Sequence, residues 1–99
     1  MIIQPIKLTT SDNILKEKYD SGNIVLATCD ATDGSFVIDM PDCGDALNTL
    51  FVFNKIDGLR EKILTLNPIL GQLIQLETEQ QFRIGSVILW TDGLNYYTA

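Results

Sequence analysis

Carboxylates are the side chains of this sequence with the greatest capacity for chemistry, because it contains no histidine. Histidine is the commonest general base and metal ligand of proteins. The densest group of acids is Asp30, Asp33, Asp39, Asp42 and Asp45. Ca²⁺ takes several carboxylate and carbonyl oxygens from a flexible loop, but the spacing of these aspartates does not match an EF-hand loop. We interpret Asp33 as a turn residue and the others as solvated strand ends, and we expect neither a metal nor another cofactor.

Nucleophilic catalysis has no recognisable basis in the sequence. A hydroxyl nucleophile needs an adjacent general base, and no motif supplies one to the serines and threonines near the turns. The motifs G-x-S-x-G and G-x-G-x-x-G and the phosphate-binding P-loop are missing from the sequence. We therefore expect that the protein is not an enzyme and has no catalytic residues.

Three aromatic residues near the C-terminus offer surfaces on which a sugar could stack, namely Trp90, Tyr96 and Tyr97. Aromatic rings supply a large and rigid contact area. Adjacent residues of a strand point to opposite faces, so Tyr96 and Tyr97 cannot both contact one ligand. Aromatic side chains are more often buried in a core or an interface, and we prefer that interpretation.

The charge and the apolar runs restrict the partners of the chain. Thirteen acids against seven bases give a net charge of −6, which disfavours binding to nucleic acid. The longest apolar runs, such as Val87–Trp90, have four residues, whereas a membrane helix needs about 20. The sequence opens without a recognisable signal segment, so we expect synthesis in a cytoplasm and no membrane association. In that reducing compartment Cys29 and Cys43 are expected to be free, buried thiols.

The residues Phe82–Ala99 are expected to form the central pair of strands, joined by a hairpin turn at Asp92-Gly93. Four large side chains share the face that we expect to be the core, namely Phe82, Ile84, Ile88 and Trp90. Val87 and Leu89 fall on the other face. A strand that is apolar on both faces indicates that the second face is buried against a neighbouring chain.

Further apolar runs precede this hairpin, at residues 24–31, 35–40, 50–56, 59–66 and 73–77. The turn dipeptides Asp33-Gly34 and Asp57-Gly58 separate two pairs of these runs, which predicts two more hairpins. About seven strands without a sustained helical period predict an all-β fold, a compact antiparallel sandwich or barrel. The alternative is a helix over Leu59–Leu66, but the flanking Asp-Gly and Asn-Pro disfavour it.

Residues 1–20 differ from the rest, and we expect an N-terminal attachment arm there, followed by a knob domain at residues 21–99. Pro5 restricts the arm to an edge or isolated strand, because proline cannot donate a ladder hydrogen bond. The apolar residues of the arm have no hairpin partner nearby, so we expect them to bind another protein. These residues are Ile2, Ile3, Ile6 and Leu8. The alternative is that the arm adds a strand to its own or a neighbouring sandwich.

Four short motifs give the sequence a family resemblance, and they are Met40-Pro41-Asp42, Phe51–Lys55, Ile69–Gln72 and Asp92–Tyr97. Their succession resembles the small β-domains of tailed-phage fibres. Those domains contain a Leu-Pro-Asp strand end, a Phe-x-Phe-Lys-Asn strand, an Ile-x-Gly-Gln stretch and a final Asp-Gly-x-Asn-Trp-Tyr. The resemblance covers residues 24–99, with Met40 in place of the usual leucine and Tyr96 in place of the usual tryptophan.

The resemblance implies a structural protein of the virion, because such domains are trimeric appendages of phage tails or heads. A short chain with one knob is similar to the head fibres of crAss-like phages. We therefore expect a homotrimeric head-fibre or capsid-decoration component, bound to capsid or other virion proteins through its N-terminal arm. We place the trimer interface at Val87, Leu89 and Tyr97. The alternative is a tail-fibre or adhesin module that binds host surface glycan. A third function, acidic mimicry of nucleic acid, is disfavoured by the interspersed bases.

Overall fold

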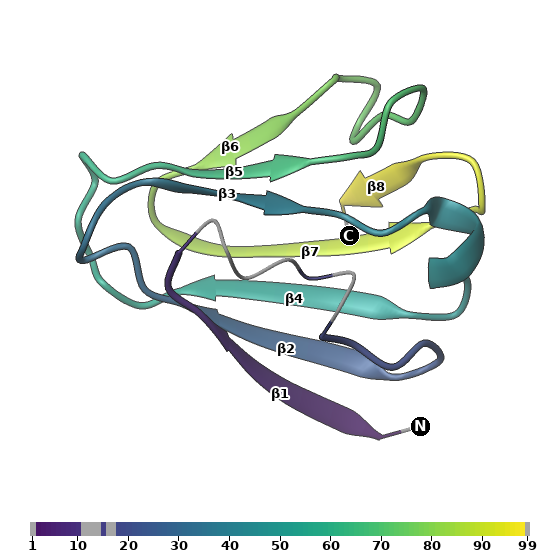
Figure 1. Ribbon diagram of the computed structural model, residues 1–99, viewed down its shortest axis with the longest axis horizontal. Helices are drawn as coiled ribbons and strands as arrows, with labels where there is room; N and C mark the ends of the chain where they lie inside the picture. The colour runs from purple at the N-terminus through teal and green to yellow at the C-terminus, as the bar shows by residue number, and fades with distance from the viewer. Residues whose placement is uncertain (1, 11–14, 16–17, 99) are drawn as a thin grey trace.

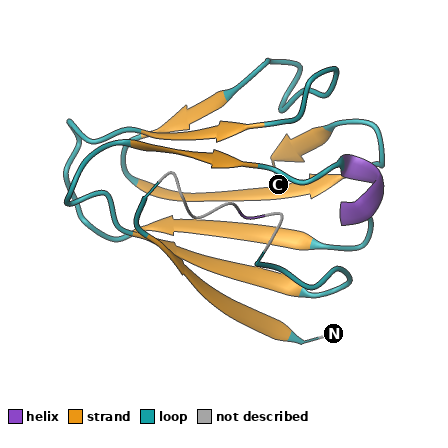
Figure 2. Ribbon diagram, in the orientation of Figure 1, coloured by secondary structure: helices purple, strands orange, loops and turns teal. Residues whose placement is uncertain are grey.

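Alternating apolar residues build two β-sheets in the computed structural model, which describes residues 2–10, 15 and 18–98 (Figure 1). Within these residues the larger sheet has five strands in the order β1-β2-β4-β7-β8, and the smaller has three in the order β3-β5-β6. The strands of the larger sheet are β1 (Ile3–Leu8), β2 (Ile24–Cys29), β4 (Leu50–Lys55), β7 (Gly85–Thr91) and β8 (Tyr96–Thr98). The strands of the smaller sheet are β3 (Phe36–Asp39), β5 (Leu64–Asn67) and β6 (Gln80–Phe82). A short 3-10 helix, η2 (Cys43–Ala46), lies before β4 (Figure 2).

The core lies between the two sheets, because each strand turns every second side chain inward. Phe51 and Phe53 of β4 are fully buried, and Phe51 packs edge-to-face against Tyr96 of β8. Leu64 and Leu66 of β5 belong to the smaller sheet and to the same apolar cluster. The all-β class predicted from the sequence is therefore confirmed, as two open sheets in a sandwich-like arrangement and not as a closed barrel.

Both sheets are mixed, so the prediction of purely antiparallel strands is wrong. The pairs β1–β2, β2–β4 and β3–β5 are parallel, whereas β4–β7, β5–β6 and β7–β8 are antiparallel. The hairpins predicted at Asp33-Gly34 and Asp57-Gly58 are also wrong, because both connections take the chain from one sheet to the other. These connections, residues 30–35 and 56–63, are longer than a two-residue hairpin turn. Successive strands of one sheet can then pair in parallel.

The C-terminal hairpin is confirmed, but its buried face is the opposite of the predicted one. β7 and β8 pair antiparallel. Leu89 is fully buried, whereas Trp90 and Ile84 are exposed. The predicted alternation began at Phe82, which lies on β6 in the smaller sheet. A bend follows, and Gly85 adopts a φ of +83° at the start of β7. The bend breaks the alternation, so the face occupied by Phe82 does not continue along β7.

Residues 2–10, 15 and 18–20, the described part of the predicted arm, belong to the two-sheet structure and do not form a separate arm, and the rest of the predicted arm lies outside the described residues. β1 lies at an edge of the larger sheet and pairs in parallel with β2. Leu15 is buried in the core, and Tyr19 packs edge-on against Phe51. The edge position predicted from Pro5 is therefore confirmed. The alternative in which this stretch adds a strand to its own sandwich is the arrangement observed.

Two predicted strands differ from the structure. The strand predicted over residues 59–66 is shorter, because β5 begins at Leu64, and the disfavoured helix does not form there. The run at residues 73–77 forms isolated bridges through Ile74 instead of a strand, because Gln75 and Leu76 adopt positive φ angles and turn the chain. With β1 included, the described residues form eight strands.

Candidate functional site

The surface best suited to binding is the side of the larger sheet that faces away from the core, called here the outer face. Alternation places every second residue of the strands on it. The strand register aligns these residues in rows, with Leu26 beside both Pro5 and Val52, and Val52 opposite Ile88. The outer face consists of Ile3, Pro5, Lys7, Ile24, Leu26, Thr28, Leu50, Val52, Asn54, Ser86, Ile88, Trp90 and Tyr97.

Apolar side chains on the outer face are open to solvent. Ile3 is 60% exposed, Leu26 38%, Ile88 36% and Trp90 42%. Between them lie half-buried apolar residues, namely Ile24, Leu50 and Val52. A sheet with one solvated face usually carries polar residues there. The outer face is therefore apolar over most of β1, β2, β4 and β7. Its row at one end is polar and consists of Lys7, Thr28, Asn54 and Ser86.

Trp90 and Tyr97 form the aromatic part of the outer face. Their ring centroids lie 5.0 Å apart and the ring planes are tilted by 33°. The Tyr97 hydroxyl donates to Oδ2 of Asp92 at 3.3 Å, and backbone N–H groups of the adjoining turn lower the pKa of Asp92. Tyr96 points into the core instead, where its hydroxyl donates to the carbonyl of Pro41 at 2.7 Å. The prediction that the two tyrosines face opposite ways is confirmed.

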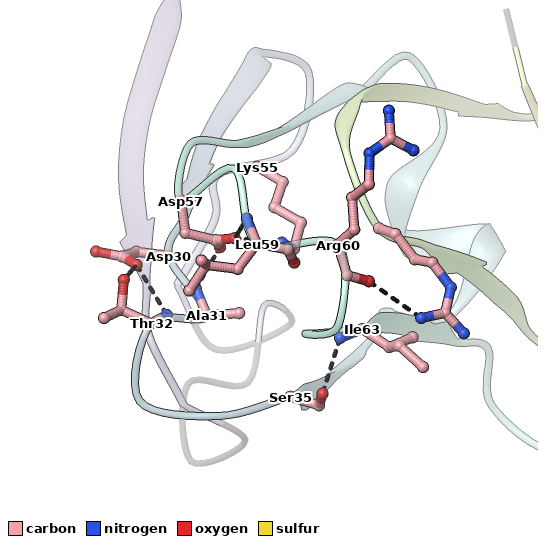
Figure 3. Close-up of polar contacts among 10 residues, drawn as sticks. Asp30, Ala31, Thr32, Ser35, Lys55, Asp57, Leu59, Arg60 and Ile63 are labelled. Atoms are coloured by element: carbon pink, nitrogen blue, oxygen red, sulfur yellow. Dashed lines mark hydrogen bonds and ion pairs between the residues drawn. The ribbon is translucent and has the colours of Figure 1, made fainter.

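A buried ion pair closes one end of the two sheets (Figure 3). Lys55, at the end of β4, donates from Nζ to Oδ1 of Asp57 and, at 2.9 Å, to the carbonyl of Leu59. The same carboxylate accepts from the N–H of Leu59 at 2.8 Å and of Ala31 at 2.7 Å. Burial by itself raises the pKa of Asp57, but the hydrogen bonds from Lys55, Ala31 and Leu59 lower it to about 2. The carboxylate oxygens are thus engaged internally, which gives the pair a structural role.

Other hydrogen bonds tie neighbouring loops together at this end (Figure 3). The N–H of Ile63 donates to Oγ of Ser35 at 2.8 Å and joins the two connections between the sheets. Nη1 of Arg83 donates to the carbonyl of Arg60 at 3.0 Å and attaches the bend between β6 and β7. The polar groups of this end therefore hold loops in place.

Three of the four motifs behind the resemblance meet at the opposite end of the molecule (Figure 1). Nε2 of Gln72 donates to Oδ1 of Asp42 at 3.3 Å, and its Oε1 accepts from the N–H of Cys43 at 3.0 Å. Oδ1 of Asn95 accepts from the N–H of Leu73 at 3.0 Å. The polar residues of these motifs therefore position three loops against each other.

The aspartates considered for Ca²⁺ divide between the two ends. Asp30 lies on the connection after β2 and accepts from the N–H of Thr32 at 3.0 Å. Asp42 lies at the other end and caps η2 by accepting from the N–H of Gly44 at 2.8 Å. In the part of the chain that the structure describes, no three His, Cys, Asp or Glu side chains come together as a metal-binding group.

Both cysteines are free and buried, as predicted. Burial, followed by the negative charge of Asp57, raises the pKa of the Cys29 thiol to about 12. Burial also raises the pKa of the Cys43 thiol. Both thiols therefore stay protonated at neutral pH.

The residues predicted for capsid attachment fall into two groups. Ile2 and Ile3 are exposed at the start of β1. Leu8 is fully buried and Ile6 packs against the core. The last two side chains are therefore part of the fold, and only the first two are accessible to a partner.

Of the residues predicted for the trimer interface, Tyr97 lies on the outer face, whereas the other two point inward. Leu89 is buried in the core and Val87 packs against it. The exposed positions Ile88 on β7 itself and Leu26 on β2 were not among the predicted residues. The signal for them was present, because β2 and β4 are apolar on both faces, as β7 is. The pairing of these strands decides which face is inside.

Comparison with models of protein families, with curated proteins and with solved structures finds no match to this chain. Among residues 2–10, 15 and 18–98, no helix is long and apolar enough to cross a membrane. The function is therefore inferred from the outer face and from the motifs of the sequence.

Proposed function

We propose that this protein is a structural component of a tailed-phage virion, a homotrimeric head fibre or capsid decoration. The observation that carries the proposal is the apolar outer face. A contiguous exposed apolar patch marks an interaction surface, and most soluble oligomers are symmetric assemblies of identical chains. The four motifs indicate the class of assembly, because the domains that they resemble are trimeric virion appendages.

Attachment to a capsid or other virion protein is placed at the start of β1. Ile2 and Ile3 are exposed there, and three copies of this end on one trimer would strengthen binding by multivalency. Ile2→Asp should therefore abolish decoration of particles while the chain stays folded. Decoration at the wild-type level would contradict this placement.

Two measurements test the proposal. Mass spectrometry of purified virions, combined with labelling of this chain on the particle, should detect the protein on the head. Analytical ultracentrifugation at micromolar concentration should give the mass of three chains. Absence from purified particles contradicts the virion role, and a stable monomer contradicts the trimer.

A second candidate is glycan binding, which the Trp90–Tyr97 pair favours. Exposed aromatic rings can stack on the apolar face of a sugar, and Trp90 is the single tryptophan of the chain. Its fluorescence therefore reports this position alone. Host polysaccharide should quench the fluorescence in a saturable manner if a glycan binds there, and Tyr97→Ala should weaken the effect. Unchanged fluorescence at all concentrations excludes the candidate.

A further inference from the structure

We propose that the outer face is the surface through which copies of this chain pack against each other, with the row Leu26, Val52 and Ile88 at its centre. The number of three copies rests on the proposed function. The choice of this face rests on the structure of the single chain, and three observations support it.

The first observation is the extent of the apolar surface. Leu26, Val52 and Ile88 lie side by side on the three middle strands of the larger sheet. Five strands spaced about 4.8 Å apart, each with about five residues rising about 3.3 Å, span roughly 400 Å². Two such faces together present roughly 800 Å² before side-chain relief is counted, which is below the roughly 1,200 Å² of a standard interface and within the range of small interfaces. The face can thus form a small interface with copies of itself.

The second observation is the distribution of charge. The chain as a whole carries a net charge of −6, so copies repel each other wherever their acidic surfaces approach. On the outer face, within the described residues, Lys7 is the charged side chain, and it lies on the edge strand β1. Copies can therefore meet there without burying a carboxylate, which is costly to desolvate. A strongly charged partner would find little complementary charge, whereas a second outer face is apolar in the same way.

The third observation concerns the edge strand β1. The carbonyls of Ile2 and Leu8 accept hydrogen bonds from the N–H groups of Ile24 and Asp30, on the side of β2. In a parallel pair alternate residues bond to the same neighbour, so the backbone of Ile3, Pro5 and Lys7 points outward. Proline has no N–H, and this edge therefore lacks a donor at its middle. Addition of a strand from another copy is hindered there.

The other edge strand, β8, is already hydrogen-bonded to residues 73–75 of the same chain. The N–H of Tyr96 donates to the carbonyl of Leu73 at 2.8 Å, and the N–H of Gln75 donates to the carbonyl of Tyr96 at 3.0 Å. The N–H of Thr98 donates to Oε1 of Gln75 at 2.9 Å. Because both edges of the larger sheet are obstructed, its copies associate by turning their outer faces toward a common axis and not by extending the sheet, and in a trimer each face contacts parts of the other two.

The test compares Leu26→Asp and Ile88→Asp with Val37→Asp. Val37 is an outward residue of β3 with 39% exposure, close to that of the other two, so it controls for the low strand propensity of aspartate. Multi-angle light scattering and sedimentation should show that Leu26→Asp and Ile88→Asp dissociate the assembly, with an increase of at least 100-fold in the dissociation constant. Val37→Asp should leave it intact. Circular dichroism should show β structure in all three variants.

Trp90 supplies a second readout that depends on contact at the face. Dilution of the wild type and the Ile88→Asp substitution should both shift its emission to the red, because the indole becomes exposed to water. An assembly that stays intact in both Leu26→Asp and Ile88→Asp overturns the choice of face but does not contradict the trimer. A dimer that Ile88→Asp dissociates supports the face and overturns the threefold stoichiometry. A wild-type protein that is monomeric at tens of micromolar overturns both the choice of face and the trimer. Saturable quenching of Trp90 by polysaccharide in the intact assembly also overturns this face.

Discussion

The two sheets have similar inner faces but different outer faces. Five residues of the smaller sheet point outward, namely Val37, Asp39, Thr65, Asn67 and Gln81. Two of them are joined by a hydrogen bond from Nδ2 of Asn67 to Oδ1 of Asp39 at 3.2 Å. The larger sheet has one polar outward row, Lys7, Thr28, Asn54 and Ser86, but its other outward rows are apolar, with Leu26, Val52 and Ile88 at the centre. Since the smaller sheet forms with mostly polar outward residues, an apolar outer face is not needed to build a sheet of this fold. It indicates contact with something outside the chain.

The largest loss of stability is expected when the end that joins the two sheets is loosened. Asp57→Asn leaves the ammonium group of Lys55 buried without its ionic partner, so the free energy of unfolding should fall by about 3–5 kcal/mol. Asp33→Asn, in an exposed turn of the neighbouring connection, should change it by less than about 0.5 kcal/mol. Urea unfolding of both variants measures the difference. Equal stabilities would show that the ion pair does not hold the sheets.

The ion pair also predicts a dependence of stability on pH. The pKa of Asp57 is about 2 in the folded chain, against an ordinary value of 3.8. The unfolded chain therefore takes up this proton first, and the contribution to stability is present above pH 3.8 and lost as the pH falls through about 2. Urea midpoints of the wild type should decline over this window more steeply than those of Asp57→Asn. Parallel curves for the two proteins would contradict the assignment.

Two adjacent residues of β7, one buried and one on the outer face, should differ in how much their substitution destabilises the monomer. Leu89 is fully buried, so Leu89→Ala should lower the free energy of unfolding of the monomer by about 2–5 kcal/mol. Ile88→Ala should cost the monomer about 1 kcal/mol or less, and its main effect should be on assembly. The free energies of unfolding of the two variants are measured by urea unfolding at protein concentrations below the dissociation constant of the assembly. A similar cost at both positions would mean that the outer face is part of the core.

The smallest effect is expected along the edge strand. If β1 is paired as described, the amides of Gln4, Ile6 and Leu8 point toward β2 and should exchange slowly with deuterium. The amides of Ile3 and Lys7 point outward and should exchange at least tenfold faster. Hydrogen exchange resolved by residue tests this alternation. If all amides of β1 exchanged equally fast, the strand would not be paired with β2, and the prediction of a free N-terminal arm would hold.

Local sequence patterns predicted those features of the fold that depend on neighbouring residues. The Asp92-Gly93 turn predicted the C-terminal hairpin, Pro5 predicted an edge strand, and the lack of a helical period predicted an all-β chain. The cysteines were expected to be free and buried. The hairpin and the edge strand follow from the chemistry of a few neighbouring residues, whereas the all-β class follows from the pattern along the chain and the free thiols from the expected reducing compartment.

Features that depend on distant strands were not predicted. The connections after β2 and β4 contain Asp-Gly, but whether such a segment returns along the same sheet or crosses to the other is decided by where the next strand finds an apolar partner. The direction of Trp90 and Leu89 was ambiguous for a related reason, because both faces of β7 are apolar. Pairing of Phe51 with Leu89 turns Leu89 inward, and a single sequence does not reveal that register. Val87 and Leu89, which were predicted for the trimer interface, therefore point toward the core, and the trimer interface itself stays a prediction.

Because Cys29 and Cys43 are buried and protonated, their sulfurs are protected from disulfide exchange. Disulfide exchange requires a thiolate that can reach its target, and Cys29 is fully enclosed with a pKa of about 12. Cys43 is also enclosed within the fold. The folded state therefore protects both sulfurs from disulfide exchange in a reducing and in an oxidising medium, and folded copies do not become cross-linked through them when they are crowded together.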